Sequence, residues 1–179
     1  MSARTILPAT LCCTFSLLWP CAVPAVPMAN DPQGFGGITW GSAFKESEDY
    51  LLAESSPRIK GYELKQGPPP LGEAKMEMMR FLTIDGKFAR VVARYQGKQT
   101  HTQVLTYLEA KYGPLDRTPG QFSGGGMLQY LNWSGPETEI TLTFDVKRER
   151  GVIFIESRTL ASRFEEGMAP DSDLSGATY

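Results

Sequence analysis

Apolar and polar residues alternate over residues 76–95, and the dipeptide Asp85-Gly86 interrupts this pattern near its middle. Alternation with a period of two is typical of a β-strand with one buried face. An Asp-Gly pair between two such runs favours a type I′ turn, because both central residues of that turn need a positive φ. The pattern therefore predicts an antiparallel hairpin in which Ile84 pairs with Lys87.

This register divides the hairpin into two faces. The first face is apolar apart from Arg80 and is expected to lie in the core; its residues are Met76, Met78, Leu82, Ala89, Val91, Ala93 and Tyr95. The second face mixes aromatic and charged side chains in the predicted pairs Thr83 with Phe88, Phe81 with Arg90, Met79 with Val92, and Glu77 with Arg94. One face is thus assigned to packing, and the other is open to a further role.

A partner-binding surface is the functional interpretation of the mixed face. Exposed aromatic and arginine side chains dominate the energetics of many protein interfaces. The predicted binding residues are Phe81, Phe88, Arg90, Arg94 and Trp133. The alternative is structural: such cross-strand pairs also stabilise a sheet by about 0.2 to 1 kcal/mol each, or lie under a loop.

Residues 100–113 predict a helix. Thr100 and Gln103 have the spacing of a capping box. An apolar stripe follows, made of Val104, Leu105, Leu108 and Tyr112. Gly113 can adopt the left-handed conformation that ends many helices. Since the connection to the hairpin is short, we expect this helix to pack directly on the sheet.

Three further strands are predicted near the carboxyl end, at 127–133, 138–146 and 152–160, the middle one by strict alternation. A shorter strand is predicted at 62–65, and a helix at 42–53 with weaker periodicity. Together with the hairpin, these elements supply six strands and two helices.

A glycine-rich segment at 30–41 precedes the first predicted helix. It alternates the large side chains of Phe35, Ile38 and Trp40 with small residues. Glycines at this density suit a close approach of two backbones. We expect a short edge strand or arm that tucks these three side chains into the core.

The predicted elements follow the order helix, three strands, helix, three strands. The simplest architecture is an α+β fold with two layers, in which both helices lie on one face of an antiparallel sheet, with a possible tandem repeat of helix plus three strands. We expect a single domain at 30–164 and a disordered acidic tail at 165–179.

Residues 1–29 have the features of a secretory signal peptide. Arg4 is their only charged residue, and a mostly apolar run follows it. We expect cleavage after Ala25 or Ala29. The mature protein is then expected to be exported, either to the periplasm or out of the cell. Two alternatives stay open: an uncleaved membrane anchor, although the apolar run is shorter than the about 20 residues that a span needs, and lipid attachment at Cys21.

The composition limits the catalytic, metal-binding and partner-binding chemistry that is open to the chain. All three cysteines (Cys12, Cys13 and Cys21) lie in the leader, so a chain cleaved after it has no disulfide framework, cysteine nucleophile or thiolate metal site. Of the 18 basic residues only Arg4 lies in the leader, whereas all 20 acidic residues follow it, which leaves a net charge near −3. This charge argues against a nucleic-acid partner. No motif for a metal or another cofactor is present, and none is expected.

Few residues are candidates for catalysis. His101 is the single histidine, and at the first turn of a predicted helix it is expected to be a solvated surface group without an orienting partner. Glu137 and Glu139 lie on one side of a predicted strand, and paired carboxylates can perform acid and base chemistry. A deep pocket that holds Glu137, Glu139 or Asp145 with a raised pKa would indicate an enzyme.

Several segments carry a resemblance to a known family. They are Phe35-Gly-Gly-Ile38-Thr-Trp40-Gly41, Gly86-Lys87-Phe88 with the strand that follows, residues 105–113, Tyr130-Leu-Asn-Trp133 and residues 140–144. This pattern resembles uncharacterised small exported bacterial proteins that share an F-x-G-I-x-W-G motif, over most of residues 35–157. At fold level, the order of helix and strands is similar to the β-lactamase-inhibitor-protein fold and to small lipoproteins of the outer-membrane assembly machinery. That similarity implies binding through the sheet.

We therefore predict a non-enzymatic exported interaction module that binds a protein or another envelope component through its sheet face. The alternative is a carboxylate-dependent, hydrolase-like enzyme of the cell envelope.

Overall fold

The computed structural model describes residues 28–115, 122–123 and 127–168. An eight-stranded antiparallel sheet, a small two-stranded hairpin and two helices form the described part, and the predicted α+β class is confirmed at this level. The strands are β1 (Gly34–Phe35), β2 (Ile38–Thr39), β3 (Tyr50–Ser55), β4 (Ile59–Leu64), β5 (Met78–Ile84), β6 (Lys87–Gln96), β7 (Phe122–Ser123), β8 (Leu128–Ser134), β9 (Thr138–Asp145) and β10 (Arg150–Ser157). The helices are α1 (Lys98–Tyr112) and α2 (Arg158–Met168).

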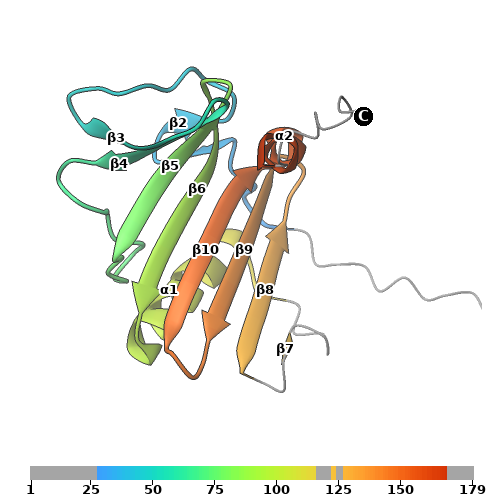
Figure 1. Ribbon diagram of the computed structural model, residues 1–179. Coiled ribbons are helices and arrows are strands. Elements are labelled where there is room, and N and C mark those ends of the chain that lie inside the picture. Colours follow the sequence, from blue (N-terminus) through green and yellow to red (C-terminus); the bar gives the residue numbers. More distant parts are fainter. Residues whose placement is uncertain (1–27, 116–121, 124–126, 169–179) are drawn as a thin grey trace, which may run out of the picture.

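The large sheet is built from two β-meanders. Its strand order is β3-β4-β5-β6-β10-β9-β8-β7, and the two meanders meet where β6 pairs antiparallel with β10 (Figure 1). A helix follows each meander, α1 after β6 and α2 after β10. The predicted order of a helix and three strands is observed for α1 and β8, β9 and β10, whereas no helix precedes β3 within the described residues, so the tandem repeat is not confirmed.

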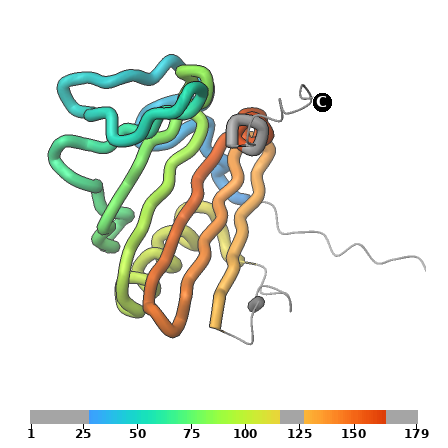
Figure 2. Tube along the Cα trace, in the orientation of Figure 1, coloured from blue at the N-terminus to red at the C-terminus, as the bar shows by residue number. Residues whose placement is uncertain are grey.

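The main core lies between α1 and one face of the sheet. Its centre is formed by Val91, Ala93 and Tyr95 of β6, Ile153 and Ile155 of β10, Ile140 and Leu142 of β9, and Val104, Leu108 and Tyr112 of α1. Of the apolar stripe predicted for the helix, Val104, Leu108 and Tyr112 are buried and Leu105 is partly buried. Figure 2 shows α1 in yellow and the N-terminal segment in blue behind the sheet, with α2 in front of it.

A smaller core forms under α2 on the other face of the sheet. Leu160 and Phe164 of this helix pack with Ile59, Ile84 and Ala89. The ring of Phe164 also lies 4.3 Å from the guanidinium carbon of Arg90. Since Arg90 is the neighbour of Val91 in β6, its side chain points away from the main core. The two helices therefore lie on opposite faces, and the prediction of two helices on one face is wrong.

The carboxyl end differs from its prediction in a related way. The third predicted strand, 152–160, ends at Ser157, where α2 begins. Residues 165–168, assigned to a disordered tail, belong to α2, whereas 169–179 lie outside the described residues. The other two predicted strands in this half correspond to β8 and β9.

The Asp-Gly turn forms as predicted, but the register beyond it does not. Asp85 and Gly86 have φ values of 50° and 76°, and Ile84 pairs with Lys87. A bulge then inserts one extra residue in β6, so that Phe81 pairs with Val91 instead of Arg90. Because side chains alternate with a period of two, this shift of one residue turns β5 over relative to the prediction.

Residues 42–53 do not form the predicted helix. The end of this range is the edge strand β3, which pairs with β4. Tyr50 starts this strand, and its ring packs against Phe44 and Phe81. The local sequence lacks a clear helical stripe, and its aromatic side chains, Phe44 and Tyr50, pack partly buried against the main core instead. Tertiary packing has decided the structure here.

The two ends of α1 differ in how well the sequence predicted them. The helix begins at Lys98, with Gly97 at the N-cap and no side-chain capping bond, so the capping box predicted at Thr100 does not form. At the other end, Gly113 has a φ of 97° and donates its N–H to the carbonyl of Glu109, so the predicted stop is confirmed. Within the described ranges, neither helix is both long and apolar enough to span a membrane.

The N-terminal segment is tied to the second meander. The backbone N–H groups of Met28 and Ala29 donate to the carbonyls of Ser134 (3.2 Å) and Tyr112 (2.8 Å). The predicted leader thus overlaps the fold by two residues, while 1–27 lie outside the described residues. Downstream, the predicted aromatic arm is confirmed, because three of its side chains pack on the main core: Phe35, Ile38 and Trp40.

Candidate binding site on the open sheet face

Among the described residues, the sheet face opposite α1 is covered by a helix at one end only, where α2 lies (Figure 1). Alternation along β6 directs Arg90, Val92 and Arg94 to this face. They line a hollow of about 440 Å³, which we call the open-face hollow. Its complete lining is Glu54, Ser56, Ile59, Met78, Arg80, Leu82, Arg90, Val92, Arg94, Phe154 and Phe164.

Arg80 is held in place by two glutamates from neighbouring strands. Its Nη1 donates to Glu54 at 2.7 Å, and its Nη2 and Nε donate to one oxygen of Glu63 at 2.7 and 3.0 Å. The hydrogen bond to Glu63 raises the pKa of Arg80 above its usual value, against the opposing effect of burial. Arg80 therefore contributes a rigid, already neutralised group to the hollow.

Arg90 is also neutralised and is the more enclosed arginine. It donates to Glu156 on β10, and the two side chains are 17% and 16% exposed. Its guanidinium carbon lies 4.3 Å from the ring centre of Phe164 and 5.9 Å from that of Phe154. These contacts fix Arg90 between α2 and the sheet, where cation–π attraction adds to its ion pair.

Arg94 differs from the other two arginines of the hollow. Its cross-strand neighbours are Met78 and Val152, which have no charge. The side chain is exposed, and it makes no ion pair or side-chain hydrogen bond within the described ranges. Arg94 is thus the cation of the open-face hollow that an external carboxylate could reach.

Three predicted binding residues lie on the wrong side of the sheet for this role. Phe81, Phe88 and Trp133 are buried in the main core. Phe81 sits in an aromatic cluster with Phe44, and the indole N–H of Trp133 donates to the carbonyl of Gly113 at 3.0 Å. The bulge in β6 explains Phe81 and Phe88, because it moves both rings to the face that α1 covers. Only Arg90 and Arg94 of the predicted set face the open side.

The structure supplies other apolar groups instead. Met78 and Val92 replace the predicted aromatics on β5 and β6, and Phe154 and Phe164 come from β10 and α2. Alternation between Ile153 and Ile155 could have placed Phe154 on the open face from the sequence. Phe164 could not have been found this way, because its position depends on α2, which the sequence did not predict.

His101 is buried, which contradicts the expected solvated position. Its Nδ1 lies 2.7 Å from the hydroxyl of Tyr95, its Nε2 lies 3.1 Å from Oε1 of Gln129, and its ring stacks on Phe144 at 3.8 Å. Burial lowers the pKa of His101, opposed by the bond to Gln129, and burial also raises the pKa of Tyr95. A neutral imidazole that accepts from Tyr95 and donates to Gln129 satisfies both of its ring nitrogens.

The carboxylates proposed for the enzyme alternative lie apart from the open-face hollow. Asp145 accepts from the backbone N–H groups of Lys147 and Arg148 in the β9–β10 turn, and the bond to Arg148 lowers its pKa. Glu139 accepts from the amide of Asn132 at 2.7 Å, and Glu137 lies outside β9. A lowered pKa at Asp145 is the opposite of what an acid catalyst at neutral pH requires.

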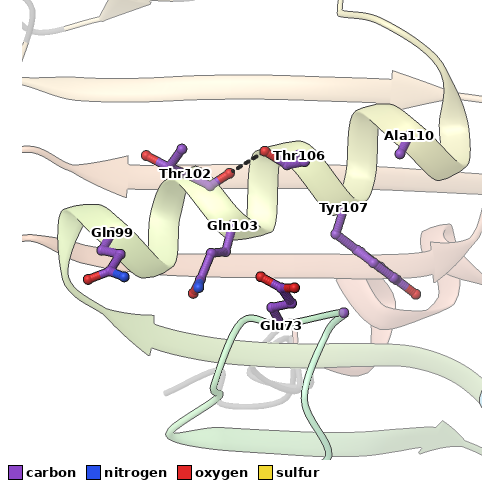
Figure 3. A pocket seen from close by; sticks show the side chains of 8 residues that line it. Glu73, Gln99, Thr102, Gln103, Thr106, Tyr107 and Ala110 are labelled. Atoms are coloured by element: carbon purple, nitrogen blue, oxygen red, sulfur yellow. Dashed lines mark hydrogen bonds between the residues drawn. The ribbon is translucent and has the colours of Figure 1, made fainter.

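A second hollow, of about 520 Å³, lies on the side of α1 that faces away from the sheet. Figure 3 shows Gln99, Gln103 and Tyr107 of α1 reaching toward Glu73 of a neighbouring loop. The side chains are mostly neutral. In the ranges described, no three acidic, histidine or cysteine side chains gather to hold a metal ion.

Comparisons with known protein families, curated proteins and solved structures give no match to this chain. The resemblance based on the F-x-G-I-x-W-G motif therefore stays a prediction.

Proposed function

We propose that this protein is an exported, non-enzymatic binding module that engages a protein segment through its open sheet face. The observation that carries this proposal is Arg94, an exposed arginine without an internal carboxylate, beside the apolar side chains of Met78, Val92 and Phe154. Arginine is one of the residue types enriched in interface hot spots.

Rigidity of the surrounding groups supports binding. Arg80 and Arg90 are fixed by ion pairs to three glutamates, so the rim of the hollow is ordered before a partner arrives. Preorganised groups lose less conformational entropy on association. The same pairs leave Arg94 as the charge that selects the partner. The expected partner segment therefore carries one carboxylate for Arg94 and an apolar side chain for the hollow.

Substitution of Arg94 tests this proposal. The change Arg94→Glu reverses the charge at the hollow, and Lys147→Glu makes the same charge change in the exposed β9–β10 turn as a matched control. Cell-envelope proteins retained by immobilised wild-type protein are compared with those retained by each variant, by mass spectrometry. We expect a specific partner to be retained by wild type and by Lys147→Glu but lost by Arg94→Glu.

Equal retention by Arg94→Glu and wild type would contradict the role of the open-face hollow. Raised salt should weaken the retention, because an exposed ion pair is screened over about 10 Å at 0.1 M ionic strength. The melting temperature of each variant establishes that the fold is intact, since both side chains are exposed.

A further inference from the structure

A separate hollow lies where the β5–β6 turn meets the segments before β3 and before β4. Its volume is about 520 Å³. The lining residues are Ala43, Phe44, Lys45, Pro57, Arg58, Lys60, Tyr62, Asp85 and Gly86. We call it the corner pocket. It shares no lining residue with the open-face hollow, so the inference below does not depend on the proposed function.

Backbone hydrogen bonds join the three segments that form the corner pocket. The N–H of Phe44 donates to the carbonyl of Gly86 at 3.1 Å, and the N–H of Asp85 donates to the carbonyl of Arg58 at 2.8 Å. The guanidinium of Arg58 donates to both carboxylate oxygens of Asp85, from Nε at 3.1 Å and from Nη2 at 2.9 Å. The walls of the pocket are therefore fixed relative to one another, which is what a binding site requires.

Positive charge prevails around the corner pocket, although the whole chain has a net charge of −2. Asp85 is already paired with Arg58, and this hydrogen bond, helped by the nearby charges of Arg163 and Lys87, lowers the pKa of Asp85. The ammonium groups of Lys45 and Lys60 make no hydrogen bond or ion pair with any residue that the structure describes. Two lysines thus face the pocket without an internal counter-charge.

The floor of the corner pocket is aromatic and offers a hydroxyl donor. The rings of Phe44 and Tyr62 meet edge to face, with their centres 5.2 Å apart. Tyr62 is only 4% exposed as a residue, but its hydroxyl oxygen is not fully enclosed, since the only buried polar side-chain atom without a partner in the described ranges is Oδ1 of Asn132. Burial, together with the charge of Glu46, raises the pKa of Tyr62, so this hydroxyl keeps its proton at neutral pH. A hydroxyl without an internal partner is free to donate to a group bound in the pocket.

We propose that the corner pocket binds a phosphate ester, with Lys45, Lys60 and the Tyr62 hydroxyl as donors to the phosphate oxygens. Lys45 comes from the segment before β3, and Lys60 and Tyr62 both come from β4. Three donors suit a phosphate monoester, which has three terminal oxygens. The pocket is much larger than an inorganic phosphate, which leaves space for an organic body against Phe44 and Pro57. The ester could come from a soluble metabolite or from a lipid headgroup, which share this chemistry.

Calorimetric titration of the full chain with phenyl phosphate tests the soluble source. Sedimentation with vesicles of phosphatidic acid and phosphatidylcholine, against vesicles of phosphatidylcholine alone, tests the lipid source. We expect the double variant Lys45→Gln/Lys60→Gln to weaken binding by at least about tenfold, since both charged hydrogen bonds are lost. The matched control Lys147→Gln removes a lysine from the β9–β10 turn and should bind as wild type does.

The variant Tyr62→Phe separates a ligand contact from a structural role. Because the hydroxyl has no internal partner, its removal should leave the melting temperature unchanged while it weakens binding several-fold. The proposal is overturned if neither probe binds the wild-type chain, or if Lys147→Gln lowers affinity as much as the double variant. It is also overturned if Tyr62→Phe lowers stability but leaves affinity unchanged. Selective binding of one probe identifies the source of the ester.

Discussion

His101 links the first turn of α1 to the sheet through two hydrogen bonds and a stacked ring. Tyr95, on the other side of the imidazole, is 1% exposed and comes from β6. Gly151 on β10 lies opposite Tyr95, and a Cβ atom at Gly151 would come within 1.9 Å of the Tyr95 ring. Glycine is thus needed here for space alone. Tyr95, His101 and Gly151 form one unit, in which the glycine admits the ring and the histidine orients it.

Replacement of Gly151 by alanine tests this close packing. The Tyr95 ring cannot move aside easily, because it is bonded to His101 and stacked near Phe144. We expect Gly151→Ala to lower the free energy of unfolding by about 1–3 kcal/mol, measured by urea denaturation. In a double-mutant cycle, the Tyr95→Ala background should remove most of this effect. Additive effects of the two changes would contradict the proposed clash.

The buried histidine also predicts a dependence of stability on pH. Its pKa is lower in the folded chain than in the unfolded chain, where it is about 6.5. The unfolded state therefore takes up a proton first as the pH falls. The contribution of His101 to stability is full above about pH 6.5 and is lost progressively below it.

The variant His101→Gln removes this titration and should show a smaller loss of unfolding free energy between about pH 7.5 and 5.5 than wild type. Denaturant titrations at both pH values measure the difference. An identical loss in the two proteins would show that His101 does not titrate in this way.

Some elements followed from local sequence, and others did not. The Asp85-Gly86 turn and the end of α1 at Gly113 depend on backbone preferences of single residues, so they could be predicted. The bulge in β6 depends on how β5 and β6 pack between two cores, and no local signal marks it. A single extra residue then placed Phe81 in the core and changed the predicted binding surface.

The contacts of Met28 and Ala29 favour one of the two predicted cleavage sites of the leader. Both residues donate backbone hydrogen bonds to the domain, and Met28 is 8% exposed. Cleavage after Ala29 would remove these contacts, whereas cleavage after Ala25 would keep them. If the predicted leader is cleaved, we therefore expect intact-mass analysis of the mature protein to show an N-terminus at Val26. A mass that corresponds to an N-terminus at Asn30 would contradict this expectation.

The stability of two shortened chains tests whether these N-terminal contacts matter. A chain that starts at Asn30 should be less stable than one that starts at Val26, by about 1 kcal/mol or more for each hydrogen bond and the buried side chain that are lost. Thermal unfolding of both chains measures this difference. Met28→Ala in the longer chain separates the side-chain contribution from that of the backbone.

At the scale of the whole molecule, the two faces of the large sheet have different roles. One face forms the main core with α1 and the N-terminal arm, while the other keeps its centre open beside α2. The predicted use of a sheet face for binding is compatible with this arrangement, although its aromatic residues were assigned to the wrong side. The arginines were placed correctly because alternation within β6 holds from Arg90 to Arg94, beyond the bulge.

Site-specific photo-crosslinking tests the central claim most directly. A photoreactive phenylalanine analogue replaces Val92 in the open-face hollow or, as a control, Thr102 on the exposed side of α1, in the full chain expressed in cells. We predict a crosslinked protein adduct at Val92 that is absent at Thr102 and is lost when Arg94→Glu is added. No adduct at Val92, or the same adduct at both positions, would contradict binding through the open sheet face.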